Sequence, residues 1–339
     1  VFGPARNPWN PDRTPGGSSG GAAVSVASGM TSIAQGSDGG GSVRIPCALS
    51  GLYGIKATQG RVPRRWTSEH SWHPVNNSSV GPLTWTVEDA AVLLNVLSGP
   101  SDDAEAGRLP NIPPDFTQCL PRGVKGLKIA LSIDMGGAAV DPEVTSAVRK
   151  AAAVFEELGA TVEETDFRPD DNSELMRRFF DFFCIKSAII FGHLLDDHAD
   201  ELTDYFREDL EHGRSVQTRY YDTLNAIGKY RAYSERFFRD YDLLLGPVTA
   251  VPAFDIGNPP LEIAGRPVDH PGWGFIPFTP IFNLTGNPAA SAPCGFSSDG
   301  MPIGLHIIGR MQDEETVLAA SAAFESARPW AQRRPGLSL

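Results

Sequence analysis

Residues 36–44 (GSDGGGSVR) place three consecutive glycines directly before Ser42. Glycine has no Cβ atom, so such a run can turn tightly and aim successive backbone N–H groups at one point. Acyl transfer needs this arrangement, because a serine hydroxyl attacks a carbonyl while N–H groups hold the developing oxyanion. A flexible surface loop is the plainer alternative. A phosphate cradle is disfavoured, since no Gly-x-x-x-x-Gly-Lys-Ser/Thr motif is present.

A second glycine–serine cluster lies shortly upstream, at residues 14–21 (TPGGSSGG). Residues 22–34 (AAVSVASGMTSIA), between the two clusters, are small and apolar, which predicts a closely packed helix followed by a short buried strand. One helix and one strand can return the chain to its starting end. We therefore expect Ser18 and Ser42 to meet at one end of a sheet.

Residues 128–164 have the pattern of a strand–helix–strand unit. Asp141 is the expected N-cap of its helix, Pro142 the first helical residue and Gly159 the stop. Such a unit predicts a largely parallel sheet. Residues 170–240 are helical and amphipathic in pattern. The remaining expected elements are a helix ending near Leu97, a buried strand at 241–247, a hairpin of 289–296 with 302–309, and a final helix from Asp313.

The composition narrows the classes of partner. The 339 residues carry a formal net charge of −12, which disfavours nucleic acid because no basic field collects phosphates. No apolar run is long enough to cross a bilayer, so no membrane partner is expected. Four scattered cysteines without a Cys-x-x-Cys pair indicate reduced thiols in a cytoplasmic protein, not disulfides or a zinc site.

The two glycine–serine segments resemble the signature region of the amidase signature family. The stretches that carry this resemblance are NPWNPDRTPGGSSGGAAVSVASG from Asn7 and GSDGGGSVRIPC from Gly36, supported by LSGLYGIKATQG, FNLTGNPA and PIGLHIIGR. The resemblance implies an α/β fold with a large mixed, mostly parallel β-sheet covered by helices on both faces. It also implies one amidase signature domain over residues 1–339, with the nucleophile region at 1–98, the rest of the same sheet at 125–339, and a variable helical segment at 170–240.

The same resemblance assigns a Ser–cis-Ser–Lys triad to an amidohydrolase. Ser42 matches the nucleophile, and Ser18 matches the bridging serine, which follows a cis peptide bond with Gly17 and relays a proton. The backbone N–H groups of Gly39, Gly40, Gly41 and Ser42 are expected to form the oxyanion hole. No metal or organic cofactor is implied; a small-molecule amide is the expected partner, and a homodimer is left open.

The lysine of the triad is the missing member. In the family it lies upstream of the glycine–serine segments, so we expect it to precede Val1. Lys56 is expected to be structural, because the family's lysine at that position is not catalytic. Two alternatives remain: a catalytically incomplete fragment, and the A subunit of a tRNA-dependent amidotransferase. Such a subunit usually reads Ser-Ser-Leu-Asp-Gln-x-Gly-Pro where residues 76–82 read NNSSVGP, which favours a stand-alone amidase.

Ser19 has a competing interpretation. Residues 17–21 satisfy Gly-x-Ser-x-Gly, the nucleophile elbow of α/β-hydrolases, but that motif follows a hydrophobic strand and residues 7–15 (NPWNPDRTP) cannot form one. We therefore expect a structural hydroxyl at Ser19. None of the seven histidines has a recognisable triad context; His193, His198 and His212 are expected to be solvated.

Two charged residues, Asp38 and Arg44, flank the glycine run. A loop that aims a nucleophile must be held rigid. We therefore expect these two residues to form an ion pair or to clamp the backbone of the loop; two independent surface charges are the alternative.

Aromatic residues on two loops predict a pocket that prefers apolar or aromatic amides, because ring burial gives large apolar contact at low entropic cost. The expected pocket residues are Trp66, Trp72, Trp273, Phe275 and Phe278. The alternative is that these side chains only fasten their loops to the core. A preference for carboxylated amides would instead direct attention to Arg61, Arg64 and Arg65.

Overall fold

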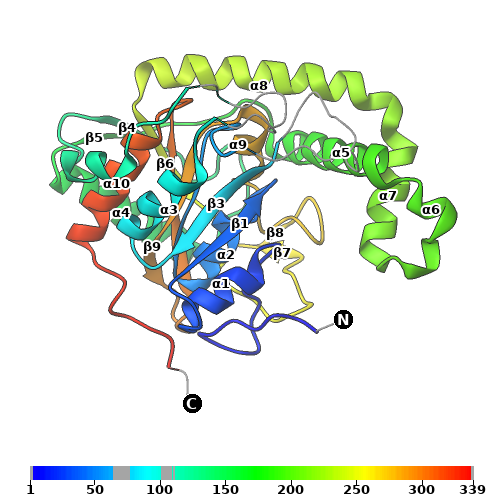
Figure 1. Ribbon diagram of the computed structural model, residues 1–339, viewed down its shortest axis with the longest axis horizontal. Coiled ribbons are helices and arrows are strands. Elements are labelled where there is room, and N and C mark those ends of the chain that lie inside the picture. The colour runs from blue at the N-terminus through cyan, green and yellow to red at the C-terminus, as the bar shows by residue number, and fades with distance from the viewer. Residues whose placement is uncertain (1–2, 64–76, 101–108, 110, 337–339) are drawn as a thin grey trace.

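The computed structural model describes residues 3–63, 77–100, 109 and 111–336. Its centre is an eight-stranded sheet of order β1-β3-β2-β9-β10-β6-β4-β5 (Figure 1). The strands are β1 (Ile33–Asp38), β2 (Tyr53–Lys56), β3 (Ser79–Thr84), β4 (Lys128–Leu131), β5 (Thr161–Glu164), β6 (Leu243–Pro247), β9 (Ala289–Phe296) and β10 (Pro302–Gly309). Strands from the first 98 residues and from the remainder of the chain therefore share one sheet.

The sheet is mixed, and its parallel part is small. β4 pairs in parallel with β5 and with β6, whereas the other neighbouring strands of this sheet are antiparallel. The α/β class is confirmed, but the expectation of a mostly parallel sheet is wrong. That expectation generalised from one strand–helix–strand unit, and only such crossovers impose parallel pairing.

The segment between the two serine clusters forms α1 (Gly20–Ala27) followed by β1, as predicted. α1 packs its small side chains, including Ala23 and Val26, into a cluster with Leu83 of β3. β1 is an edge strand, and Ile33 at its start is 41% exposed. The expectation of a buried strand is therefore wrong: of the six residues of β1, only the last, Asp38, is buried.

The strand–helix–strand unit forms where the sequence predicts it, from β4 through α4 (Pro142–Glu157) to β5. The Asp141 side chain accepts hydrogen bonds from the backbone N–H groups of Glu143 and Val144, which caps the helix. Gly159 ends the helical segment with a φ of +93°, a conformation that favours glycine.

Residues 170–240 form the predicted helical segment, and its part at residues 194–216 projects away from the sheet (Figure 1). Its helices are α5 (Asn172–Phe191), α6 (Leu194–Asp197), α7 (Asp204–Val216) and α8 (Tyr220–Asp240), with 3-10 turns η2 (Ala199–Glu201) and η3 (Gln217–Arg219). The other elements are α2 (Arg44–Ser50), α3 (Val87–Leu97), η1 (Phe116–Arg122), β7 (Glu262–Ile263), β8 (Arg266–Pro267), α9 (Pro280–Thr285) and α10 (Glu314–Ala327). Within the described ranges, every helix is too short or too polar to cross a lipid bilayer.

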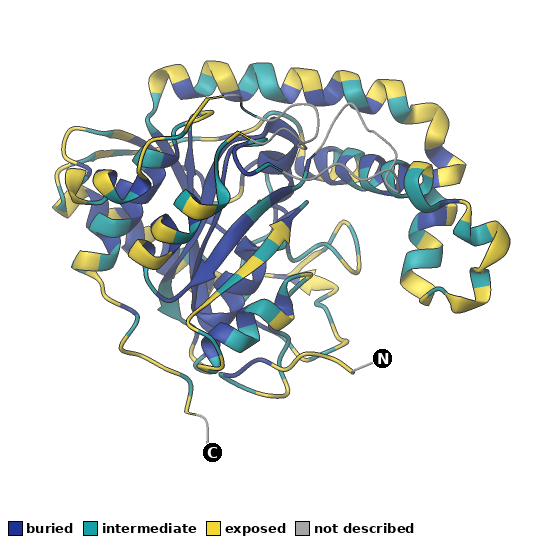
Figure 2. Ribbon diagram, in the orientation of Figure 1, coloured by how far each residue is buried: buried dark blue, intermediate teal, exposed yellow. Residues whose placement is uncertain are grey.

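Helices cover both faces of the sheet, as expected. Leu243 and Leu245 of β6 belong to one hydrophobic cluster, with residues of α3, α4 and α10. Leu244, which points to the opposite face, belongs to a second cluster with residues of α5, α8 and α9. Figure 2 shows the buried sheet between these layers, while exposed residues lie on the outer sides of the helices.

Because β3 lies very close to β2 at Gly81, adding one methyl group there should strongly reduce stability. In Gly81→Ala, the new Cβ atom would overlap the Ile55 carbonyl oxygen, a backbone atom that the sheet holds in place. We expect a loss of about 3 kcal/mol in the free energy of unfolding, measured by urea denaturation. The same change at Gly228, in the open interior of α8, should add about 0.5–1 kcal/mol. Equal effects at both positions would contradict this packing argument.

Candidate active site

Ser42 lies where the chain leaves the sheet. β1 ends at Asp38, and residues 39–42, which we call the nucleophile loop, lead to Val43, the residue that precedes α2. Gly41 has a φ of +126°, and a side chain at this position would also collide with Thr279 and Ile45. The glycines therefore allow a turn that no other residue could make here, and they present a half-buried Ser42 at its end.

The upstream serine cluster reaches the same place. The Gly17–Ser18 peptide bond is cis, as predicted. The backbone N–H of Ser19 donates to the Ser42 carbonyl at 3.2 Å, so the two serine segments are directly joined. The Ser19 hydroxyl donates to the Ser37 carbonyl at 3.3 Å, consistent with a structural role. Within the described residues, no hydrogen bond joins the Ser18 and Ser42 hydroxyls, so the proton relay stays a prediction.

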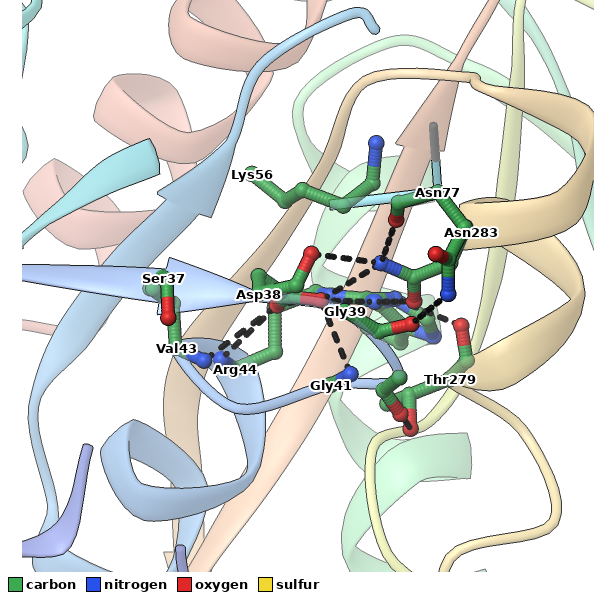
Figure 3. Close-up of polar contacts among 12 residues, drawn as sticks. Ser37, Asp38, Gly39, Gly41, Val43, Arg44, Lys56, Asn77, Thr279 and Asn283 are labelled. Atoms are coloured by element: carbon green, nitrogen blue, oxygen red, sulfur yellow. Dashed lines mark hydrogen bonds and ion pairs between the residues drawn. The ribbon is translucent and has the colours of Figure 1, made fainter. Parts of the chain in front are cut away.

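The Asp38 carboxylate clamps the nucleophile loop from within. It accepts hydrogen bonds from the backbone N–H groups of Gly41 at 2.8 Å, Val43 at 3.3 Å and Arg44 at 3.4 Å. It also forms a two-pronged ion pair with the Arg44 guanidinium, at 2.9 and 2.8 Å (Figure 3). Both side chains are completely buried. The structure therefore confirms the ion pair and the backbone clamp together.

The rest of the Arg44 guanidinium binds three residues from two distant segments. Its donors reach the Thr279 carbonyl at 3.1 Å, the Asn283 side-chain oxygen at 2.6 Å and His306 Nε2 at 3.0 Å. Arg44 thus ties the nucleophile loop to α9 and β10. Thr279 and Asn283 lie in the stretch FTPIFNLTGNP, but nothing in a single sequence indicates that this stretch would contact residues 38–44.

Burial and the positive charge of Arg44 together shift the pKa values of two neighbours, Asp38 and His306. Burial alone would raise the pKa of Asp38, but the charge and hydrogen bonds of Arg44, with contributions from Lys56 and Asn283, hold it well below the ordinary 3.8. Burial, reinforced by the Arg44 charge, lowers the pKa of His306 well below 6.5. A neutral His306 can accept the Arg44 hydrogen bond at Nε2, because a guanidinium only donates.

The clamp changes the composition of the expected oxyanion hole. The Gly41 N–H already donates to Asp38, so assigning it to an oxyanion is wrong. The N–H groups of Gly39, Gly40 and Ser42 make no hydrogen bond to another described residue. These three donors remain available to a developing negative charge beside Ser42.

The expected aromatic pocket residues separate into distinct groups. Trp66 and Trp72 lie outside the described residues. Phe278 is fully buried in the core, and Phe275 packs edge-on against Phe254. These contacts agree with the alternative that such side chains fasten their loops. Trp273 is different, because it lines a cavity of about 270 Å³ together with Phe180 and Met176 of α5.

Charged residues also line this cavity, and the sequence did not indicate that they would meet. Asp181 is almost fully buried and accepts hydrogen bonds from Arg177 at 2.9 Å and Arg219 at 3.3 Å. His212 Nε2 lies 2.9 Å from the same carboxylate, and its ring packs on Phe180. The expectation that His212 is simply solvated is therefore wrong, because its partner Asp181 comes from a different helix.

Lys56 is buried in β2, and its ammonium donates to the Ala57 carbonyl at 3.0 Å. Burial, with the nearby Arg44 charge, lowers the pKa of Lys56 to about 7, although Asp38 and Glu314 oppose this shift. A structural role in the strand agrees with this position. Among the described residues, no three His, Cys, Asp or Glu side chains are grouped so that they could hold a metal ion.

Comparison with known proteins gives a consistent result. Residues 1–318 match the protein family described as Amidase. The chain is similar to the acylamidase of Rhodococcus erythropolis, with 34% identity over 349 residues that cover 100% of this chain and 70% of that protein. It is also similar to the A subunit of the glutamyl-tRNA(Gln) amidotransferase of Lactiplantibacillus plantarum, with 35% identity over 96% of this chain and 70% of that protein. The crystal structure of a bacterial aryl acylamidase of the amidase signature enzymes matches with a TM-score of 0.89 and 35% identity, over 98% of this chain and 69% of that one.

The low pKa of Lys56 predicts how stability depends on pH. Between pH 7 and 10.5 the unfolded chain holds a proton on Lys56 that the folded protein lacks, so stability rises with pH across this window. Lys56→Met removes the effect and should stabilise the protein most at pH 7 and below, by an amount of the order of 5 kcal/mol. The measurement is urea unfolding at several pH values, with Lys150→Met at an exposed position as the control. Parallel stability curves for wild type and Lys56→Met would rule out the shift.

Proposed function

Because the chain belongs to the amidase signature family, we propose that it is an amidohydrolase that cleaves a linear carboxamide into an acid and ammonia or an amine. The observation that carries the proposal is the surroundings of Ser42. Its segment is joined to the segment of the cis-peptide residue Ser18, and beside it lie three backbone N–H groups that make no hydrogen bond to another residue in the described part of the chain. This combination supplies a nucleophile and an oxyanion hole at one point.

In the proposed reaction, Ser42 Oγ attacks the carbonyl carbon of the amide. The Ser42 proton passes to Ser18, and Ser18 gives its own proton to a neutral lysine that precedes Val1, as the family resemblance implies. The tetrahedral oxyanion is held by the N–H groups of Gly39, Gly40 and Ser42. The C–N bond then breaks, the leaving nitrogen takes the proton back along this relay, and water releases the acid from Ser42.

The cavity at Trp273 supports an apolar or aromatic substrate. The Phe179 ring lies against Gly40 of the nucleophile loop and also packs on Trp273, with ring centroids 5.7 Å apart. The aromatic cavity therefore lies close to the proposed oxyanion hole. A planar apolar group would gain by burial against Trp273 and Phe180. Arg61 is not free to bind a carboxylated substrate, because it forms a buried ion pair with Glu314; Arg64 and Arg65 lie outside the described residues.

The A subunit of a tRNA-dependent amidotransferase is the second candidate, since relatives with that name match at 33–36% identity. The residues at 76–82 depart from the motif typical of such subunits, and we therefore favour a stand-alone enzyme. Activity that appears only with partner subunits would reverse this choice. Intact-mass measurement of the purified protein distinguishes both candidates from a catalytically incomplete fragment, because it reveals any sequence upstream of Val1.

Removal of the proposed nucleophile gives the first test. Ser42→Ala should lower amide turnover by about 10⁴-fold or more, because the acyl-enzyme cannot form. The melting temperature should hardly change, since the Ser42 hydroxyl is half-buried and makes no hydrogen bond within the described residues. Ser19→Ala is the matched control and should retain most of the activity. Near-normal turnover in Ser42→Ala would show that Ser42 is not the nucleophile.

Substrate preference gives the second test. We expect aryl and alkyl amides to be hydrolysed faster than matched amides that carry a carboxylate. Trp273→Ala should raise KM for the aryl amide by about tenfold, because the ring loses its stacking surface. Steady-state kinetics on the three substrates measures both effects. Equal or better turnover of the carboxylated amide would contradict the proposal of an apolar pocket.

A further inference from the structure

The direction of each N–H group in the nucleophile loop is set by the carbonyl before it. A trans peptide unit is planar, so its C=O and the following N–H point in opposite directions. The Asp38 carbonyl accepts from Asn283 Nδ2 at 2.8 Å, the Gly39 carbonyl from Asn77 Nδ2 at 2.6 Å, and the Gly40 carbonyl from the Thr279 hydroxyl at 2.6 Å. Holding the Gly39 carbonyl therefore aims the Gly40 N–H, one of the three available donors.

Asn77 is itself held in one orientation. Its side-chain oxygen accepts a hydrogen bond from Lys186 Nζ at 2.6 Å. Its backbone carbonyl accepts from Asn283 Nδ2 at 3.0 Å, and Figure 3 shows Asn77 and Asn283 side by side. An ammonium can only donate and the Gly39 carbonyl can only accept, so a flipped Asn77 amide would lose both contacts. The residue is 1% exposed, so water does not compete freely for these bonds.

Lys186 connects this arrangement to α5. Phe179, two helical turns earlier on the same helix, packs against Gly40 from the same side. α5 therefore contacts the nucleophile loop at two points, through the Phe179 ring and through the Lys186–Asn77 pair. The two contacts act on neighbouring glycines, Gly40 and Gly39.

We propose that Asn77 and Lys186 are positioning residues of the oxyanion hole, an inference that rests on the proposed amidohydrolase function. Lys186 fixes the Asn77 amide, and Asn77 aims the Gly40 N–H at the oxygen of the reacting carbonyl. The chain of hydrogen bonds also begins at a positive charge. It polarises the Asn77 amide and the Gly39–Gly40 peptide in the same sense, which strengthens the Gly40 N–H as a donor.

Asn77→Asp is the decisive variant because it keeps the size of the side chain and its contact with Lys186. One carboxylate oxygen still accepts from the ammonium, but the other replaces the donor and repels the Gly39 carbonyl. We expect kcat to fall about 100-fold, as for the loss of one oxyanion donor, with KM changed less than about threefold. Asn225→Asp, the same change at an exposed position of α8, should leave kcat unaltered.

Variants of Lys186 provide a second, independent test. Lys186→Met should lower kcat about tenfold, Lys186→Arg should restore most of it, and Lys186→Met should cost nothing further in an Asn77→Ala background. The rate at which a fluorophosphonate modifies Ser42 should follow kcat through the series, because its phosphoryl oxygen occupies the same hole. This rate needs no turnover of an amide.

The outcomes separate this inference from the function on which it rests. A wild-type protein that neither hydrolyses amides nor reacts with the fluorophosphonate overturns the proposed function, and this inference with it. An active wild type whose Asn77→Asp variant keeps kcat per reactive site within about threefold overturns the positioning role alone. A lower melting temperature with unchanged kcat per reactive site would reduce Asn77 to a structural residue.

Discussion

The buried ion pair between Asp38 and Arg44 is the constraint on which the site depends. Two charges removed from water are costly unless each finds full compensation. Here the Asp38 carboxylate accepts from both the Arg44 side chain and the loop backbone, and Arg44 also reaches Thr279, Asn283 and His306. The end of β1, the start of α2, α9 and β10 are therefore held in one arrangement, which a looser hydrophobic contact would not specify.

The ion pair also determines which backbone N–H groups of the nucleophile loop stay available to a substrate. Asp38 takes up the Gly41 N–H, and side chains from other segments hold the carbonyls of Asp38, Gly39 and Gly40. The N–H groups of Gly39 and Gly40 are then left pointing away from these partners. An oxyanion hole built in this way costs no reorganisation during the reaction, because its dipoles are already oriented. Helix α5 touches the loop through Phe179, and Met176 and Phe180 of the same helix line the aromatic cavity.

The sequence predicted what depends on local pattern. The cap at Asp141 and the Asp38–Arg44 pair lie within short motifs, and the structure contains both. The cis peptide at Ser18, which the family resemblance implied, is also present. The parallel character of the sheet was overstated, because pairing between distant strands is a property of the whole chain. Asn283 and Asn77 were not predicted as parts of the site. They lie far from Ser42 in the sequence and come close to it only in the folded protein, and a single sequence carries no signal of such contacts.

Ser42 is the residue that we expect to become acylated. The most direct measurement is tandem mass spectrometry of the protein after reaction with a fluorophosphonate or a slowly turned-over amide. We expect one covalent adduct, localised by fragmentation to Ser42 in the peptide that also contains Ser18 and Ser19. An adduct on Ser18, on Ser19 or on a residue outside this peptide would show that Ser42 is not the nucleophile.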